Sequence, residues 1–425
     1  MTRSAEASRS GRDGDQLDRE ATAERRWRRN VYAVTAACFL GFAGFTLVMP
    51  FLPLFIAQLG VTGVGSIAIW TGVSLGITPG LTALLAPAWG RLGDRYGRKI
   101  MVERSMISFV VLMTAMAFVT RAWHVLAIRI VQGIFAVYGS LSVAMAAESA
   151  PRDRMPSAIG LVQTAQRLGP AVGPVIGGVL AGLVGLRRAF LVTALLYAIG
   201  LAVVWVMYDD HAVARRQEVD ADVDMLPGVA RPAAAPVTFR SVLAFRNFML
   251  MLGVIFGLQF VDRSFGPVLP LYVEQLGIAH ARVPLVAGIL FSIMACSGAL
   301  GHHVCGKLLQ RFSTRLVIVG GTVVAGTGSV LVAANQIWVL CVAAVCLGLG
   351  IGAAMTASYT AAGSVIPARA HGTGFGVLTS ASLIGMASSP LIAGFLGGTS
   401  IRAVFLLNVV VMMVVAAMVQ RKMVA

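Results

Sequence analysis

The chain has 425 residues, of which 57% are hydrophobic and only 12% are charged, and its mean hydropathy is +0.82. A water-soluble domain of this length cannot carry so apolar a composition on its surface, so the lipid bilayer is the expected solvent. The formal net charge of +16 does not indicate a nucleic-acid partner, because Lys and Arg separate apolar runs instead of clustering on a soluble face. The sequence has no P-loop, His/Asp metal cluster or soluble catalytic domain, which argues against an enzyme, a cofactor or metal, and ATP as the energy source.

Residues 1–30 mix charges of both signs and have no apolar core of their own. They predict a disordered cytoplasmic tail and not a cleavable signal peptide. Beyond this tail, apolar runs recur that are long enough to cross a bilayer. They predict about twelve spans of about 20 residues or more, near 31–57, 66–89, 100–119, 123–146, 157–184, 189–207, 248–272, 283–304, 316–334, 337–361, 373–396 and 403–420.

The widest polar gap, residues 208–247, has the charge and the Pro/Ala content of a cytoplasmic linker. It divides the spans into an N-terminal six-helix bundle, 31–207, and a C-terminal one, 248–425. If both termini are cytoplasmic, most of the 34 Lys and Arg residues fall in cytoplasmic segments, as the positive-inside rule requires. We therefore expect an all-α, multi-pass protein of a bacterial inner membrane, working as a monomer.

The two halves are also repeats of each other. MPFLPLFIAQLGV, which begins at Met49, aligns with GPVLPLYVEQLGI, which begins at Gly266, and both have Pro at the second and fifth positions. GRLGDRYGRK, from Gly90, aligns with GKLLQRFSTR, from Gly306. Because six spans separate the copies, both halves cross the membrane in the same direction. In some secondary transporters such parallel repeats flank a central binding site and rock to alternate access to it.

The loop after the second span is identified as the signature loop of the major facilitator superfamily. Its glycines permit a tight reversal, its basic residues stay at the cytoplasmic face, and its carboxylate can meet a helix N-terminus or an Arg of the other half. We expect it to act as a latch that weakens during the conformational cycle; a purely topological basic loop is the alternative. The residues that carry this resemblance are Gly90, Asp94, Arg95, Gly97, Arg98 and Lys99.

The fifth span resembles the glycine signature of the drug:proton antiporters within that superfamily. At 100° per residue, Gly169, Gly173 and Gly177 share a face against which a neighbouring helix can slide. Ordinary small-residue packing is the alternative. The resemblance, which extends to bacterial multidrug efflux members over most of the chain, implies export of amphipathic compounds in exchange for protons. An uptake symporter and a non-transporting sensor are the competing interpretations. The full pattern comprises Gly160, Gly169, Gly173, Pro174, Gly177 and Gly178.

Two charged positions inside spans are candidates for proton coupling. An Arg in hydrocarbon costs several kcal/mol unless it is paired or faces water, and the resemblance places Arg129 at the superfamily's fourth-helix Arg, implicated in proton coupling. Asp262 and Arg263 lie about 14 residues, or roughly 21 Å, into the seventh span. An ionisable pair at that depth is a functional hypothesis by default, with a structural ion pair as the alternative. Glu148, at the inner end of span four, is a further proton-site candidate.

The charge pair of span seven is not part of the family pattern, so the substrate and the coupling residue stay open. Adjacent helical residues point about 100° apart, so Arg129 or Arg167 across the cavity is as plausible a partner for Asp262 as Arg263. A carboxylate there can serve in proton exchange or in cation recognition.

The substrate is expected between the halves. Gln163 and Arg167 lie one turn apart, on the opposite side of their helix from Gly169, and a polar pair is unfavourable against lipid. In the alignment of the two halves, Phe42, Phe45 and Met49 of the first half correspond to Gln259, Asp262 and Gly266 of the second. We therefore expect an aromatic and Met-lined wall of the cavity in the first half to face a polar wall in the second. Ordinary apolar packing is the alternative for Phe42, Phe45 and Met49. His302 and His303, at the end of span eight, are expected at the membrane interface.

Overall fold

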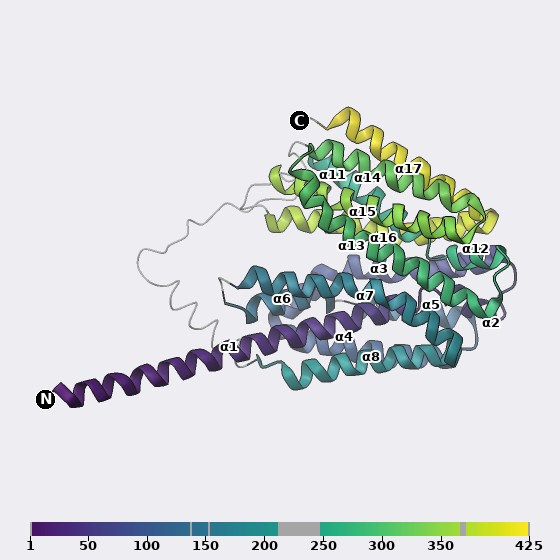
Figure 1. The fold of residues 1–425 in the computed structure, drawn as a ribbon. Helices are drawn as coiled ribbons and strands as arrows, with labels where there is room; N and C mark the ends of the chain where they lie inside the picture. The colour runs from purple at the N-terminus through teal and green to yellow at the C-terminus, as the bar shows by residue number, and fades with distance from the viewer. Residues whose placement is uncertain (1, 137, 152–153, 211–246, 366–370, 424–425) are drawn as a thin grey trace.

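The computed structural model describes residues 2–136, 138–151, 154–210, 247–365 and 371–423. Over these ranges the chain forms helices and no strand, arranged as two bundles that lie against each other (Figure 1). Both chain termini lie at one end of the molecule, which we call the terminal end (Figure 1). The opposite end, where α2 and α12 lie, is called the distal end.

The first bundle follows the spans expected from the sequence. The fourth expected span, 123–146, falls on two helices, α5 and α6, on either side of residue 137. The helices are α1 (Thr2–Leu47), α2 (Leu52–Gln58), α3 (Val64–Tyr96), α4 (Arg98–Phe118), α5 (Ala122–Phe135), α6 (Tyr138–Ser149), α7 (Met155–Val184) and α8 (Leu186–Met207).

The second bundle repeats this order after the linker, most of which lies outside the described residues. Among the residues described in both bundles, ten helices are long and apolar enough to cross a membrane, and the bent pair α11–α12 makes an eleventh span. The helices are α11 (Phe248–Ser264), α12 (Leu269–Gln275), η1 (His280–Arg282), α13 (Val283–Leu309), α14 (Thr314–Leu331), η2 (Val332–Ala334), α15 (Ile337–Val365), α16 (His371–Thr399) and α17 (Ile401–Lys422).

Proline interrupts the helix of the first and seventh spans. α1 ends at Leu47 and α2 begins only at Leu52, and α11 and α12 meet at an angle of 42°. Each gap contains a Pro, Pro50 or Pro267, which lacks the N–H of a helical hydrogen bond and disfavours helix at the preceding residue. The expected spans 31–57 and 248–272 therefore each contain a break in the helix, at the same place in both repeats.

The first helix, α1, begins at Thr2, so it includes the N-terminal segment; the disordered cytoplasmic tail stays a prediction. The last turns of this segment contain contacts that favour helix. The Trp27 Nε1 donates to Glu24 Oε2 at 2.6 Å, and Arg28 Nε lies 2.7 Å from Glu24 Oε1 in an i,i+4 pair. These local pairs favour helix just outside the first span.

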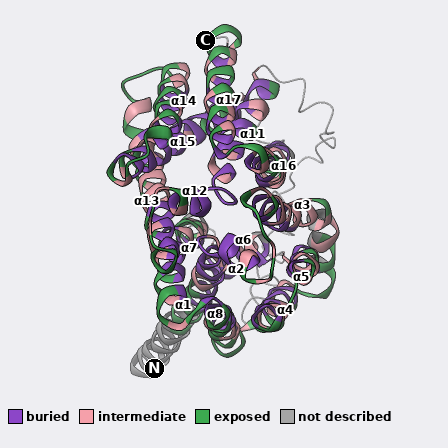
Figure 2. Cartoon of the chain, turned by 90° about the vertical axis from the view of Figure 1, so that its right-hand side faces the viewer, coloured by how far each residue is buried: buried purple, intermediate pink, exposed green. Residues whose placement is uncertain are grey.

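The bundles meet along two helix pairs, α3 with α16 and α7 with α13, which Figure 2 shows from the distal end. The two short helices α2 and α12 also contact each other there. Buried residues face the inside of each bundle, and exposed apolar residues cover the outside (Figure 2). Leu84 and Leu183, for example, are 74% and 78% exposed, as suits a surface that faces lipid acyl chains.

Candidate functional site: a cavity between the two bundles

A cavity of about 450 Å³ lies between the two bundles. The first bundle contributes side chains of α1 and α7, and the second contributes side chains of α11, α13, α15 and α16. Its lining combines apolar groups with amides and charges: Phe42, Gln163, Gln166, Arg167, Pro170, Gln259, Asp262, Arg263, Met294, Ala295, Gly298, Ala299, His302, Gly348, Ile351, Gly352, Met355, Tyr359 and Ser382. Such a mixture suits a small amphipathic ligand, whose apolar part and polar group need different partners.

The distal end of the cavity is closed by direct helix–helix contact. A Cβ added at Gly72 of α3 would overlap the carbonyl oxygen of Pro390 in α16, and one at Gly178 of α7 would overlap that of Pro284 in α13. Toward the terminal end, by contrast, a Cβ on Gly160 of α7 or Gly306 of α13 would have nothing within 4 Å. The cavity therefore opens toward the terminal end.

A second recess of about 350 Å³ continues the cavity toward that opening. It shares Arg167, His302, Met355 and Tyr359 with the main cavity, and Thr356, Thr360 and Gly363 are added. α7 of the first bundle thus faces α13 and α15 of the second across a polar recess. Any movement that closes the terminal end changes the distance between these groups.

The structure places six of the predicted residues in the cavity lining: Phe42, Gln163, Arg167, Gln259, Asp262 and Arg263. Four other candidates lie outside this lining. Phe45 and Met49 continue α1 and the turn after it toward the distal end, where the Met49 Cε would lie 3.4 Å from a Cβ built on Gly266. Arg129 lies inside the first bundle, and Glu148 lies at the terminal end of α6.

Asp262 pairs with its sequence neighbour. The Arg263 Nε lies 3.1 Å from Asp262 Oδ2, and both side chains are about one-quarter exposed. Neither Arg129 nor Arg167, the two partners considered across the cavity, makes an ion pair with Asp262 in the described part of the chain. The pair lies at the last turn of α11, immediately before the bend to α12, where the departure from regular helix lets neighbouring side chains meet.

Unlike Arg263, Arg167 lines the cavity without forming an ion pair with a carboxylate of the described residues. Its side chain is exposed within the opening between α7 and α15, and among the described residues it makes no ion pair. The cavity lining therefore contains two guanidinium groups and one carboxylate. Since Asp262 and Arg263 offset each other, the charge of Arg167 is left over.

Arg129 is only 2% exposed and is enclosed by polar groups of its own bundle. Its Nη1 donates to Gln132 Oε1 at 2.9 Å, and its backbone carbonyl accepts from Thr78 Oγ1 at 2.9 Å. The Arg129 Nε and the hydroxyls of Ser74 and Tyr197 are buried without a hydrogen-bond partner. In this conformation Arg129 does not touch the cavity, so any role in coupling acts through the packing of the first bundle.

Four polar cavity residues were missed from the sequence: Gln166, His302, Tyr359 and Ser382. His302 was expected at the membrane interface, but its Nδ1 lies 2.6 Å from Thr356 Oγ1 and its ring lines the cavity. A helical signal was present, because Ala295, Ala299 and His302 recur at spacings of four and three on one face of α13. A polar residue that continues a stripe of small residues points to a helix face that lines a cavity.

The residues of the glycine pattern lie on two faces of α7, and each face packs against a different helix. A Cβ on Gly169 would lie 2.8 Å from the backbone N of Ala43, and one on Gly177 would overlap the carbonyl of Leu47, so this face packs against α1. Pro174 and Gly178 instead meet α13, where a Cβ on Gly288 would overlap the Pro174 carbonyl. The pattern therefore sets close backbone packing both within the first bundle and between the bundles.

The signature loop joins α3 to α4 through a single residue, Gly97, whose φ of +95° is rarely adopted by residues with a side chain. The contacts of its basic residues that can be described are made within the first bundle. Arg98 Nη1 lies 2.9 Å from Glu148 Oε1, and Lys99 Nζ donates to the Tyr208 carbonyl at 2.9 Å. The side chain of Asp94 lies outside the described residues, so the expected latch to the other half stays a prediction.

Comparison with known proteins decides the family. A family model described as Major Facilitator Superfamily matches residues 34–312 and again 251–423. The chain belongs to the Major Facilitator Superfamily. It is accordingly a membrane transporter and not an enzyme, as the sequence predicted.

Individual superfamily members support the resemblance to efflux proteins. The multidrug resistance protein MdtG of Dickeya zeae (strain Ech586) is 30% identical over 394 residues, which cover 91% of this chain and 93% of that protein. The multi-drug resistance efflux pump PmrA homolog of Lactococcus lactis subsp. lactis (strain IL1403) is 28% identical over 299 residues, or 69% of this chain and 70% of that protein. Both likenesses confirm the expected similarity to bacterial multidrug efflux members.

A solved superfamily structure has the same fold. The bacterial homolog of the human lysosomal transporter Spinster, in its inward-facing and unoccupied conformation, aligns with a TM-score of 0.72 at 16% sequence identity. The alignment covers 94% of this chain and 98% of that one. This likeness confirms the two-bundle, all-α architecture.

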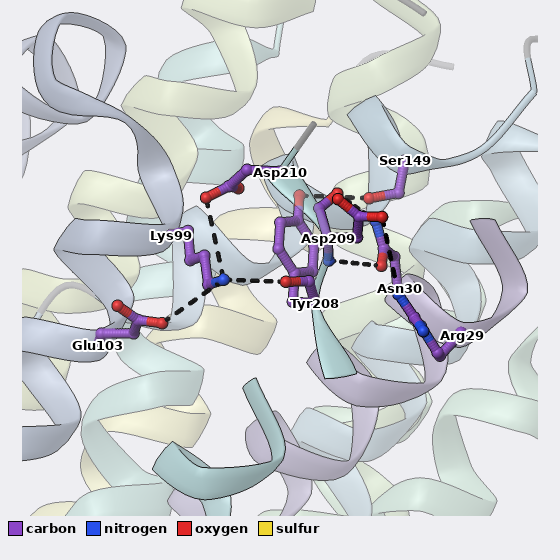
Figure 3. Close-up of polar contacts among 8 residues, drawn as sticks. All are labelled: Arg29, Asn30, Lys99, Glu103, Ser149, Tyr208, Asp209 and Asp210. Atoms are coloured by element: carbon purple, nitrogen blue, oxygen red, sulfur yellow. Dashed lines mark hydrogen bonds and ion pairs between the residues drawn. The ribbon is translucent and has the colours of Figure 1, made fainter. Parts of the chain in front are cut away.

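At the terminal end of this superfamily fold, a polar network ties the signature loop to the start of the linker (Figure 3). Lys99 lies 3.9 Å from Glu103 and 4.0 Å from Asp210, and Asn30 and Asp209 exchange two hydrogen bonds of 2.9 and 3.1 Å. Burial raises the pKa of Tyr208 well above its usual range, so its hydroxyl stays protonated and accepts a hydrogen bond from Ser149. The network holds α1, α4, α6 and α8 together as one body.

Proposed function

We propose that this transporter exports small amphipathic compounds from the cytoplasm in exchange for protons, by alternating access to one central cavity. The observation that carries the proposal is the cavity itself, lined by both repeats, closed at the distal end and open at the terminal end. The full glycine pattern of α7 and the similarity to multidrug resistance proteins support export of multiple compounds.

The orientation of the chain determines what this conformation would do. If both termini are cytoplasmic, as the distribution of Lys and Arg indicates, the cavity opens to the cytoplasm. It would then represent the conformation in which an exporter loads its substrate. Rocking of the bundles about the α3–α16 and α7–α13 contacts would close the terminal end and open the distal one.

Asp262 is the proposed proton-binding group. It is the one carboxylate in the cavity lining, and protonation would remove its ion pair with Arg263. Proton binding therefore changes both the charge of the cavity and a contact at the bend between α11 and α12. Arg129 would act more indirectly, because it lies within the first bundle.

The charge pattern favours a second candidate, proton-coupled uptake of a small metabolite. Protonation of Asp262 would free Arg263 beside the already unpaired Arg167, so a proton and an anion would bind together and not in competition. Co-binding is the requirement of symport, whereas exchange needs the two ligands to exclude each other.

Flux in proteoliposomes of known orientation separates the candidates. The purified chain would be reconstituted with a fluorescent amphiphile inside or outside, and a pH gradient of either sign imposed. Exchange predicts that the amphiphile moves against the direction of proton flow, and symport predicts that it moves with it. If the flux of every amphiphile tested is independent of the pH gradient, proton coupling is contradicted.

A further inference from the structure

We infer that the cavity selects amphiphiles that carry a negatively charged group, and that Arg167 is the residue that binds this group. The inference names a substrate class for the proposed function, and it rests on the part common to both candidates, that the transported compound binds in this cavity.

The first step is the charge of the lining. Arg167, Asp262 and Arg263 are its Asp and Arg residues, and the 3.1 Å pair between the last two leaves one positive charge uncompensated. The acidic residues Glu103 and Glu148 lie outside the cavity and pair with Lys99 and Arg98 at the terminal end. An added cation would therefore meet a net repulsion, and an added anion a net attraction.

The second step is the geometry of the donors. The guanidinium of Arg167 carries five N–H donors in a planar fork, which matches a carboxylate, sulfonate or phosphate better than it matches any neutral group. It shares the recess at the terminal end with Tyr359, Thr360 and His302 of the opposite bundle. The described lining of this recess contains no carboxylate that would oppose an anion.

The third step concerns the rest of the ligand. Phe42, Met294, Ile351 and Met355 line the main cavity, next to the recess that holds the polar group. An aromatic or aliphatic body would occupy this apolar part while its acidic group reaches Arg167. Because Arg167 belongs to the first bundle and Tyr359 to the second, one bound anion would touch both bodies that rock.

A cation held by Asp262 is the competing arrangement. It requires the cation to displace Arg263 from the carboxylate, after which both guanidinium groups and the ligand would share the cavity with one negative charge. Burying uncompensated like charges is unfavourable. The charges present in the lining therefore favour the anion.

The test uses three probes that differ only in their polar group: 2-naphthoate, 2-naphthylmethanol and 2-naphthylmethylammonium. Binding to the purified full-length chain in a neutral detergent would be measured by isothermal titration calorimetry. The carboxylate is expected to bind about tenfold or more tightly than the ammonium, as the loss of a charge-assisted hydrogen bond implies. Equal or tighter binding of the ammonium, or no binding of the carboxylate, would overturn the inference.

Variants assign the effect to Arg167. Arg167→Gln is expected to weaken carboxylate binding about tenfold while leaving the alcohol nearly unchanged. Arg167→Lys is expected to keep the preference for the carboxylate over the ammonium but with lower affinity, because it keeps the positive charge and loses the planar fork of donors. Asp262→Asn should act in the opposite direction, because it frees Arg263. Arg188→Gln is the matched control, since Arg188 is exposed on α8 outside the cavity. Equal weakening of all three probes by Arg167→Gln would show a structural role and contradict the inference.

Flux measurements distinguish this inference from the proposed function. If the carboxylate binds as expected but moves in the same direction as protons, export by exchange fails and the anion preference stands. If a pH gradient drives the ammonium and the alcohol outward but not the carboxylate, the anion preference fails and the exporter stands.

Discussion

At the scale of single residues, the central observation is that Asp262 is held by Arg263 and not by an Arg from the other bundle. An adjacent pair is maintained wherever α11 moves, so it can travel with the second bundle through the whole cycle. A pair between the bundles would have to break at each opening. The proton-dependent step is therefore expected to depend on the cavity's access to water and not on the distance between the bundles.

The first prediction follows from this pair. Asp262→Asn cannot exchange a proton, so flux driven by a pH gradient should fall at least tenfold, to near background. Exchange of labelled for unlabelled substrate at equal pH, which needs no proton, should continue. Both are measured in proteoliposomes.

A carboxylate outside the cavity provides the control for this prediction. Glu24→Gln makes the same chemical change at the terminal end, in the pair with Arg28, and should leave gradient-driven flux within about twofold of the wild type, because exposed pairs contribute little. Gradient-driven flux that persists in Asp262→Asn would remove Asp262 from the coupling scheme.

At the scale of elements, α7 organises the molecule because one face packs on α1 and another on α13. The sequence predicted that Gly169, Gly173 and Gly177 share a face, and the structure shows what that face meets. The sequence could not predict that Pro174 and Gly178 contact the other bundle, because this depends on which helix of the second half packs against α7. The distinction matters for mutations, since the two faces should affect different properties.

The face toward α1 should control stability. In Gly177→Ala the new methyl group would overlap the Leu47 carbonyl, and forcing α1 and α7 apart should cost about 1–3 kcal/mol of stability. Gly160→Ala, in the same helix and the same pattern, places its methyl group in open space and should be neutral or slightly stabilising. Thermal unfolding of the two purified variants tests this, and equal midpoints would contradict the packing described for this face.

The face toward α13 should control conformation. In Gly178→Ala the methyl group would overlap the Pro284 carbonyl only while the distal end is closed, so the variant should shift the population toward distal opening. A cysteine at Gln259 in a cysteine-free background would then react faster with an impermeant maleimide added from the distal side. Gly182→Ala is the control, since the nearest atom there is 4.0 Å away. Unchanged labelling of Gly178→Ala would contradict the assignment of this contact to the distal closure.

At the scale of the whole molecule, the sequence predicted the two bundles, their repeat and the central site, because hydrophobic runs and aligned copies report these directly. It missed the bends after Leu47 and Ser264, where the apolar run continues although Pro50 and Pro267 interrupt the helix. His302 was not predicted in the cavity lining, because which face of α13 meets the other bundle depends on how the two halves pack. The sequence could not predict that the charge of Arg167 is uncompensated, because this depends on which Arg forms the ion pair with Asp262 in the folded protein.

In the proposed transport cycle, one cavity opens alternately at the two ends of the molecule as the bundles rock. Distances between spin labels at Val206 and Gln310, near the terminal ends of α8 and α13, report on one end. Labels at Thr120 and Gln336, in the turns before α5 and α15, report on the other. Pulsed electron paramagnetic resonance in lipid nanodiscs would measure both distances with and without substrate, at neutral and acidic pH. Alternating access predicts that the terminal distance shortens in the conditions that lengthen the distal one. Two distances that stay fixed, or that lengthen together, would contradict alternating access.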